Sequence, residues 1–172
     1  MNQLSQEIRT LSYLLHPPLL DEMGLSSALR WYVDGLHERS GITIHLEVSA
    51  DLNRLSRDMQ LAIFRIVQEC LTNIHRHSGS KTARIRIDGN SDVLFVEVQD
   101  RGKGIDPDKL VRIKSSGSGV GIRGMGERIR HFGGILEIES TAEGTKVSVK
   151  FPLAKSTAAS ANLSDAMAAG AD

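Results

Sequence analysis

Residues 59–77 read MQLAIFRIVQECLTNIHRH, the clearest secondary-structure signal in the chain. Apolar residues recur there every three or four positions, which predicts an amphipathic helix with one buried face. Glu69 and Asn73 are four residues apart and Arg76 follows three later, so all three are expected on one polar face. A carboxylate and a carboxamide there can position a metal ion and a proton acceptor, and a guanidinium can bind phosphate. A solvated helix face would give the same pattern.

Segments with alternating apolar residues flank this helix on both sides. Residues 42–48, 83–87 and 93–98 alternate with period two and predict strands. Gly89-Asn90 predicts a hairpin turn, and residues 136–140 and 146–151 predict a second hairpin around Ala142-Glu143-Gly144. Hairpins rather than regular strand–helix alternation predict an α/β (α+β) two-layer sandwich, with a mixed, mostly antiparallel sheet and helices on one face.

The ends of the chain differ in composition from its centre. Residues 1–15 carry leucines and an isoleucine at helical spacing, and Pro17-Pro18 is expected to end that helix. Residues 26–38 predict another helix, capped by Ser26 or Ser27. Residues 154–172 are rich in Ala and Ser and predict a flexible tail. We therefore expect a partial helical element in 1–18, one domain in 19–153 and the tail.

Composition excludes several classes of protein. The 172 residues contain 21 Lys+Arg and 21 Asp+Glu, a balance that argues against sequence-independent nucleic-acid binding. No apolar run reaches the roughly 20 residues of a membrane span, and no signal peptide opens the chain. The single cysteine, Cys70, has no disulfide or CxxC partner, which fits a reducing compartment.

Seven of the 16 glycines fall in two motifs. In the first, Asp100 ends a predicted strand and Gly102 and Gly104 follow, a pattern typical of an ordinary turn or of close backbone approach to a ligand. In the second, SSGSGVGIRGMGERI (115–129), a Gly/Ser run enters a helix near Val120 or Gly121, a possible anion site. The polar segment between Gly104 and Gly119 reads as a mobile lid. Neither motif is a Walker A loop or a Rossmann fingerprint.

Four motifs in this order carry a resemblance to a known family. QECLTNIHRH, DRGKGI, GVGIRGMGERI and EGTKVSV resemble the N, G1, G2 and final Gly-Thr boxes of the Bergerat (GHKL) ATP-binding fold, as in the catalytic domain of two-component sensor histidine kinases. LLHPPLLDEMGLSSAL and the GMxER sequence at Gly124 to Arg128 are similar to the subfamily that signals to helix-turn-helix response regulators. The resemblance covers residues 1 to 153.

The resemblance implies roles for individual residues. Asn73 would bind Mg²⁺ bridging the ATP phosphates, and Glu69 would orient or deprotonate the phospho-accepting histidine. Arg76 and His77 would lie near the phosphates. The adenine side of the pocket would be formed by Asp100, Gly102, Gly104 and Thr145. The end of the lid and the helix start that faces the phosphates would be formed by Gly119, Val120, Gly121 and Gly124. Val120 replaces the more usual leucine of the G2 box.

The same resemblance implies ATP and Mg²⁺ as cofactors, phosphoryl transfer to a histidine on a dimerisation domain, and relay to a response regulator with a helix-turn-helix output domain. It implies a homodimeric full-length kinase with this portion in the cytoplasm and no direct contact with nucleic acid. The chain begins after the position of the accepting histidine, so we expect it to bind nucleotide without labelling itself. His16 is interpreted as structural and His37 as a surface feature, and no metal site is expected at His45, His75 or His131.

Three other functions fit parts of the pattern. Another ATPase of the same fold, such as a chaperone, gyrase-type or mismatch-repair protein, would require a large following domain with a catalytic lysine. An anti-sigma-type serine kinase would lack the Leu/Pro-rich entry region. A non-catalytic nucleotide-binding or dimerisation module would keep the pocket without transferring phosphate.

Overall fold

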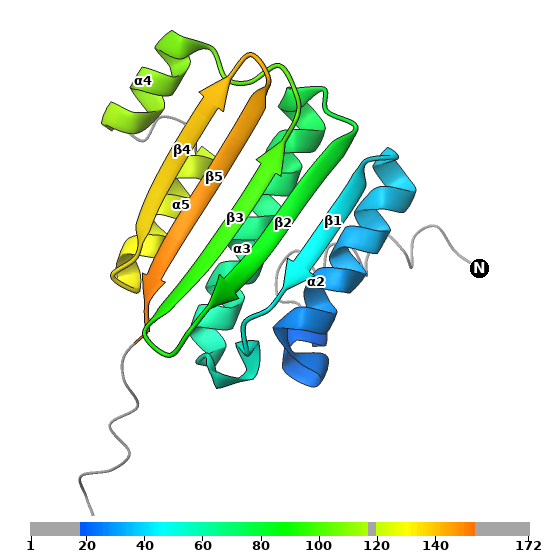
Figure 1. Cartoon of the computed structure of the whole chain (residues 1–172), viewed down its shortest axis with the longest axis vertical. Helices are drawn as coiled ribbons and strands as arrows, with labels where there is room; N and C mark the ends of the chain where they lie inside the picture. The colour runs from blue at the N-terminus through cyan, green and yellow to red at the C-terminus, as the bar shows by residue number, and fades with distance from the viewer. Residues whose placement is uncertain (1–17, 117–119, 154–172) are drawn as a thin grey trace, which may run out of the picture.

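The predicted strands form one sheet, because their alternating apolar residues must bury the same face. The computed structural model describes residues 18–116 and 120–153. Its five strands follow the spatial order β1-β2-β3-β5-β4 (Figure 1). They are β1 (Thr43–Val48), β2 (Thr82–Gly89), β3 (Val93–Asp100), β4 (Ile135–Thr141) and β5 (Gly144–Pro152). The β1–β2 pair is parallel and the other three pairs are antiparallel, which confirms the mixed, mostly antiparallel sheet.

Three helices cover one face of this sheet: α2 (Pro18–Ser40), α3 (Arg57–Asn73) and α5 (Val120–His131) (Figure 1). The apolar face of α3 is buried, and the Ser56 hydroxyl caps its start by accepting the Met59 N–H at 3.3 Å. The core between the layers includes side chains that are at most 1% exposed, among them Ile63, Ile66, Val67, Leu71, Ile85, Ile87, Leu94 and Phe151. A short 3₁₀ turn, η1 (Leu52–Arg54), precedes α3.

The end of α3 departs from regular helix. Residues Ile74–Ser78 form a single π-helical turn, η2, which ends at Gly79 with φ of 72°. A π-turn rotates the side chains relative to the preceding helix, and such turns are frequent at functional sites. Here His75, Arg76 and His77 are all exposed. The predicted helix is therefore correct to Asn73, but Arg76 belongs to a different turn geometry.

The predicted start and cap of the helix over residues 26–38 need correction. Helix α2 begins at Pro18. Proline is tolerated there because the backbone N–H groups of the first helical turn make no hydrogen bonds within the helix. It kinks at Gly24 (φ 76°, ψ 171°), two residues before the expected Ser26 cap. Glycine adopts this positive φ without steric cost. The helix expected in residues 1–15, and His16 after it, lie outside the described residues.

The polar segment expected as a lid contains a helix, α4 (Pro107–Ser116), which sequence reasoning missed. Asp106 caps it by accepting the N–H groups of Asp108 and Lys109 at 3.0 and 3.1 Å. An aspartate followed by proline is a favourable helix start. Ile113 on α4 is only 5% exposed, so the segment has an apolar anchor. Residues 117–119 and the expected tail 154–172 lie outside the described residues.

Candidate nucleotide-binding site

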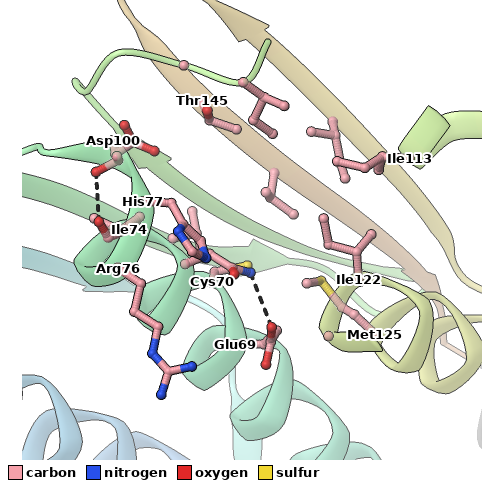
Figure 2. A pocket seen from close by; sticks show the side chains of 18 of the residues that line it. Glu69, Cys70, Ile74, Arg76, His77, Asp100, Ile113, Ile122, Met125 and Thr145 are labelled. Atoms are coloured by element: carbon pink, nitrogen blue, oxygen red, sulfur yellow. Dashed lines mark hydrogen bonds between the residues drawn. The ribbon is translucent and has the colours of Figure 1, made fainter. Parts of the chain in front are cut away.

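A cavity of about 340 Å³ lies between the C-terminal part of α3 with η2, the start of α5, α4 and strands β3, β4 and β5 (Figure 2). Its volume falls in the range of roughly 300–1,000 Å³ usual for small-molecule sites. Eight residues singled out in the sequence line it: Glu69, Asn73, Arg76, His77, Asp100, Gly104, Gly121 and Thr145. Motifs separated by up to 76 residues thus meet around one space.

The predicted residues outside this lining have other positions. Gly102 supports the wall without lining it, as described below. Gly124 lies one turn into α5, beside Arg128. Val120 begins α5, as expected, and Gly119 lies outside the described residues.

Glu69 and Asn73 are coupled by a hydrogen bond along one face of α3. The Asn73 Nδ2 group donates to Glu69 Oε1 at 3.3 Å, the bond that ends on the Glu69 carboxylate in Figure 2. This contact fixes the orientation of the amide, so its oxygen is the end that remains for a cation. The predicted pairing across one helical turn is therefore realised in the structure.

Asp100 forms the opposite end of the cavity, where β3 terminates. Its side chain is 5% exposed, and its Oδ1 accepts the Gly102 N–H at 2.7 Å. Burial raises the pKa of this carboxyl, while the backbone N–H groups of Gly102 and Thr145 act in the opposite direction. A buried carboxyl whose orientation is fixed by backbone N–H groups is suited to accept a hydrogen bond from an N–H donor on a ligand.

Glycines hold the loop after Asp100 against its neighbours. At Gly104, φ is 72° and a Cβ would collide with the carbonyl oxygen of Thr141. At Gly102, a Cβ would collide with the carbonyl oxygen of Ser78, so this glycine packs the loop onto η2. The Lys103 N–H donates to the same Ser78 carbonyl at 3.0 Å. These contacts tie the α3 side of the cavity to the sheet side.

Thr145 contacts the loop through a hydroxyl network. Its Oγ1 lies 3.0 Å from Ser140 Oγ, and Ser140 Oγ accepts the Ile105 N–H at 2.8 Å. Ser140 thus joins Thr145 on β5 to the loop beyond Gly104. The Gly-Thr motif drew attention to Thr145, but Ser140 carried no signal in the sequence because its partners are distant along the chain.

The start of α5 packs directly on Glu69. A Cβ on Gly121 would overlap the Glu69 carboxylate, so only glycine fits at this contact. The first turn of a helix presents unpaired backbone N–H groups, which favour negative charge. The site therefore combines a helix start, a carboxylate and a carboxamide at one end, with a buried acceptor at the other.

An apolar wall completes the cavity. It includes Ile113 from α4, Ile122 and Met125 from α5, Ile138 and Val147 from the sheet, and Cys70 (Figure 2). Burial raises the pKa of the Cys70 thiol to about 12, so the thiol stays neutral and serves as wall rather than nucleophile. Apolar side chains in a cavity that also contains Asp100 suit an aromatic ring system.

The remaining histidines do not add a second centre. His37 Nδ1 lies 2.9 Å from the Ile42 carbonyl oxygen and joins the end of α2 to the sheet. Residues 18–116 and 120–153 contain no group of three or more His, Cys, Asp or Glu side chains arranged to hold a metal. Across the same ranges, no helix is both long and apolar enough to cross a bilayer.

Comparison with known proteins agrees with this geometry. The family of histidine kinase-, DNA gyrase B- and HSP90-like ATPases matches residues 58–155, which include every cavity-lining position. The chain belongs to this family. Its ATPase domain therefore has the Bergerat fold that the four motifs predicted.

Two similar proteins are sensor histidine kinases. The sensor histidine kinase MctS of Rhizobium johnstonii is 34% identical over 153 residues, covering 88% of this chain and 32% of that protein. The sensor histidine kinase NarS of Mycobacterium tuberculosis is 29% identical over 153 residues, covering 89% and 35%. The chain thus spans about a third of the length of these relatives.

A solved histidine kinase structure is also similar to this chain. The histidine kinase domain of the blue-light activated kinase from Erythrobacter litoralis EL346 superposes with a TM-score of 0.63 at 25% identity, covering 75% of this chain and 65% of that one. The relatives and this structure are histidine kinases, so the other ATPases and the serine kinase considered from the sequence are not favoured.

Proposed function

We propose that the chain is the ATP-binding catalytic module of a sensor histidine kinase, which transfers the ATP γ-phosphate to a histidine on a dimerisation domain. The observation that carries this proposal is the single cavity in which Glu69, Asn73, Asp100 and Gly121 meet. The membership of the ATPase family supports nucleotide as the ligand.

The donor set fits Mg²⁺·ATP. Buried Asp100 would accept the adenine amino group, with Gly104 and Thr145 beside it. At the other end, the Asn73 amide oxygen would bind Mg²⁺, and exposed Arg76 and His77 would contact the phosphates. Mg²⁺ would supply charge neutralisation during phosphoryl transfer. Gly119, Val120 and Gly121 would present backbone N–H groups at the phosphate end, and Gly102 would brace the loop.

Glu69 is suited to act on the acceptor. Its carboxylate lies at the α5 start, held by the Asn73 amide, so it has a fixed position next to the phosphate end. From there it would accept the proton of an incoming imidazole or orient its N–H. Positioning and electrostatics account for most of the catalysis of phosphoryl transfer.

The wider biology follows as part of the proposal. Residues 1–18 would be the end of a dimerisation helix, 19–153 the catalytic domain and 154–172 a flexible tail. The parent kinase would be a homodimer whose catalytic portion lies in the cytoplasm. It would pass phosphate to a response regulator with a helix-turn-helix output domain, without contacting nucleic acid itself.

Replacing Asn73 with Asp tests the site. The change adds a negative charge beside Glu69 and removes the amide that donates to it, so we expect Mg²⁺·ATP affinity to fall at least about tenfold. Calorimetric titration with ATP and Mg²⁺ measures this, with Asn53→Asp at an exposed position as the matched control. Equal nucleotide affinity in the Asn73 and Asn53 variants would contradict the assignment.

Transfer is measured with a separately supplied acceptor domain and radiolabelled ATP. We expect acid-labile phosphate on the acceptor histidine and none on the chain alone. Acid-stable phosphate on a serine would indicate a serine kinase, and nucleotide binding without any transfer would indicate a non-catalytic module. Either result would overturn the proposed function.

A further inference from the structure

Arg65 extends the functional face of α3 by one turn. It is half-buried and precedes Glu69 by four residues, so Arg65, Glu69 and Asn73 follow one another along the same stripe of the helix. Its Nη1 donates to the Oε1 of buried Gln68 at 2.8 Å, which fixes the guanidinium. A guanidinium has five N–H donors, and this bond engages one of them.

Arg128 approaches Arg65 from α5. Gly121 touches Glu69, and α5 runs opposite to α3, so later turns of α5 lie beside earlier turns of α3. Arg128 Nη1 lies 3.3 Å from where a Cβ of Gly124 would stand, so the guanidinium folds over Gly124, back toward the start of α5. The absent side chain at Gly124 leaves the room for this orientation.

The positive charges of Arg65 and Arg128 lie close enough to interact. Burial and the charge of Arg128 both lower the pKa of Arg65. Neither Arg65 nor Arg128 makes an ion pair with a carboxylate among the residues that the structure describes. Other arginines do have acidic partners there: Arg54, Arg57, Arg84, Arg86 and Arg123. Glu127, which precedes Arg128, is itself paired with Arg123. Two neighbouring cations that make no ion pair within the described residues complement an anion from another molecule.

The position of the pair selects between candidate anions. Along the cavity, Asp100 lies at one end and Asn73 and Glu69 at the other, and Arg65 follows Glu69 on the side away from Asp100. One helical turn advances about 5.4 Å. The pair therefore lies beyond the proposed phosphate end, where a polypeptide carrying the acceptor histidine must approach Glu69.

We propose that Arg65 and Arg128 dock a carboxylate of the acceptor polypeptide that lies close to its phospho-accepting histidine. The proposal rests on the proposed function, since it requires an acceptor at Glu69. Fork-shaped guanidiniums bind carboxylates with defined geometry, so the contact would align the imidazole with Glu69 as well as hold the partner. Arg65 and Arg128 are positioning residues in this scheme.

The test compares Arg65→Gln, Arg128→Gln and the double variant in transfer to a supplied acceptor domain. Glutamine retains most of the stem and removes the charge. We expect the acceptor KM to rise about fivefold or more for each variant, as for loss of a charge-assisted hydrogen bond. The ATP affinity should remain within about twofold, and Arg128→Lys should restore part of the loss. Arg84→Gln, on an exposed pair with Glu47 on the sheet, is the control and should match the unaltered chain.

Salt gives a second readout. Because paired charges are screened, raising the ionic strength should raise the acceptor KM of the unaltered chain and have less effect on the double variant. An unchanged acceptor KM in the double variant would overturn the inference. A parallel loss of ATP affinity would also overturn the inference, because it would indicate that the arginines bind the nucleotide phosphates. A defect confined to phosphate relay to the regulator would overturn it as well. Absence of transfer by the unaltered chain would instead refute the proposed function.

Discussion

At the scale of single residues, burial of the ionised Asp100 carboxyl works against the stability of the fold. Its carboxyl is buried at the end of β3 and faces the cavity, and its pKa is raised chiefly by burial. A carboxyl whose pKa is higher in the folded than in the unfolded chain binds its proton more tightly when folded. Its contribution to stability is therefore greatest at acid pH and is lost as pH rises from the unfolded toward and past the folded pKa.

Asp100→Asn is expected to separate stability from binding. Without nucleotide, the variant should melt at a higher temperature than the unaltered chain, and the difference should be larger at pH 8 than at pH 4, because only the carboxyl ionises. Its ATP affinity should fall about tenfold or more, since an amide is a weaker acceptor than a carboxylate. Thermal unfolding and titration measure the two effects. A variant less stable than the unaltered chain at pH 8 would contradict this account.

The residues found by sequence reasoning are those whose local pattern carries the chemistry. Asn73 and Glu69 share a helical face, and Asp100 precedes its glycines directly, so spacing along the chain was sufficient. Arg65 is equally well spaced but looked like an ordinary polar position on an amphipathic helix. Arg65 differs from such a position because it lies near Arg128, which is 63 residues away in the sequence. The guanidinium of Arg128 can lie there because Gly124 has no side chain. No local pattern contains that information.

At the scale of elements, the fold was predictable where a periodic pattern ran long enough. The strands and α3 have such patterns. Helix α4 has no such pattern, since only Asp106, Pro107 and Ile113 indicate it within a polar stretch. Ile113 is buried because it is part of the apolar wall of the cavity. Helix α2 was expected to begin at a Ser26 or Ser27 cap, whereas it begins at Pro18 and is kinked at Gly24. Tertiary packing decides such cases.

The contact of α5 with α3 gives a prediction at this scale. Gly121→Ala should improve intrinsic helix propensity by about 1 kcal/mol. Its Cβ would nevertheless overlap the Glu69 carboxylate, so we expect the variant to lower both the melting temperature and the rate of transfer to an acceptor. At Gly126 a Cβ meets only the flexible end of Arg130, at 3.3 Å, so Gly126→Ala is the matched control and should be neutral or stabilising. Equal behaviour of the two variants would refute the steric argument.

At the scale of the whole molecule, the charges balance while basic groups gather around one end of the cavity. Equal numbers of acidic and basic residues give zero net charge, yet Arg76 and His77 at the proposed phosphate end and the Arg65–Arg128 pair lie around that end. The sheet face opposite the helices instead carries paired charges, such as Glu47 with Arg84 and Glu139 with Lys146. Local arrangement rather than net charge therefore identifies the functional side of this protein.

Because the cavity walls come from both layers of the fold, a bound nucleotide should stabilise the whole domain. A ligand that binds only the folded chain stabilises it by about 2.7 kcal/mol at one hundred times its Kd, which for a domain of this size raises the Tm by roughly 5–10 °C. We expect this shift with Mg²⁺·ATP, and a much smaller one at the same concentration for Asn73→Asp. Arg84→Gln, remote from the cavity, should retain the full shift. A full shift in the Asn73 variant would contradict the proposed role of Asn73, and no shift in the unaltered chain would contradict nucleotide binding in this cavity.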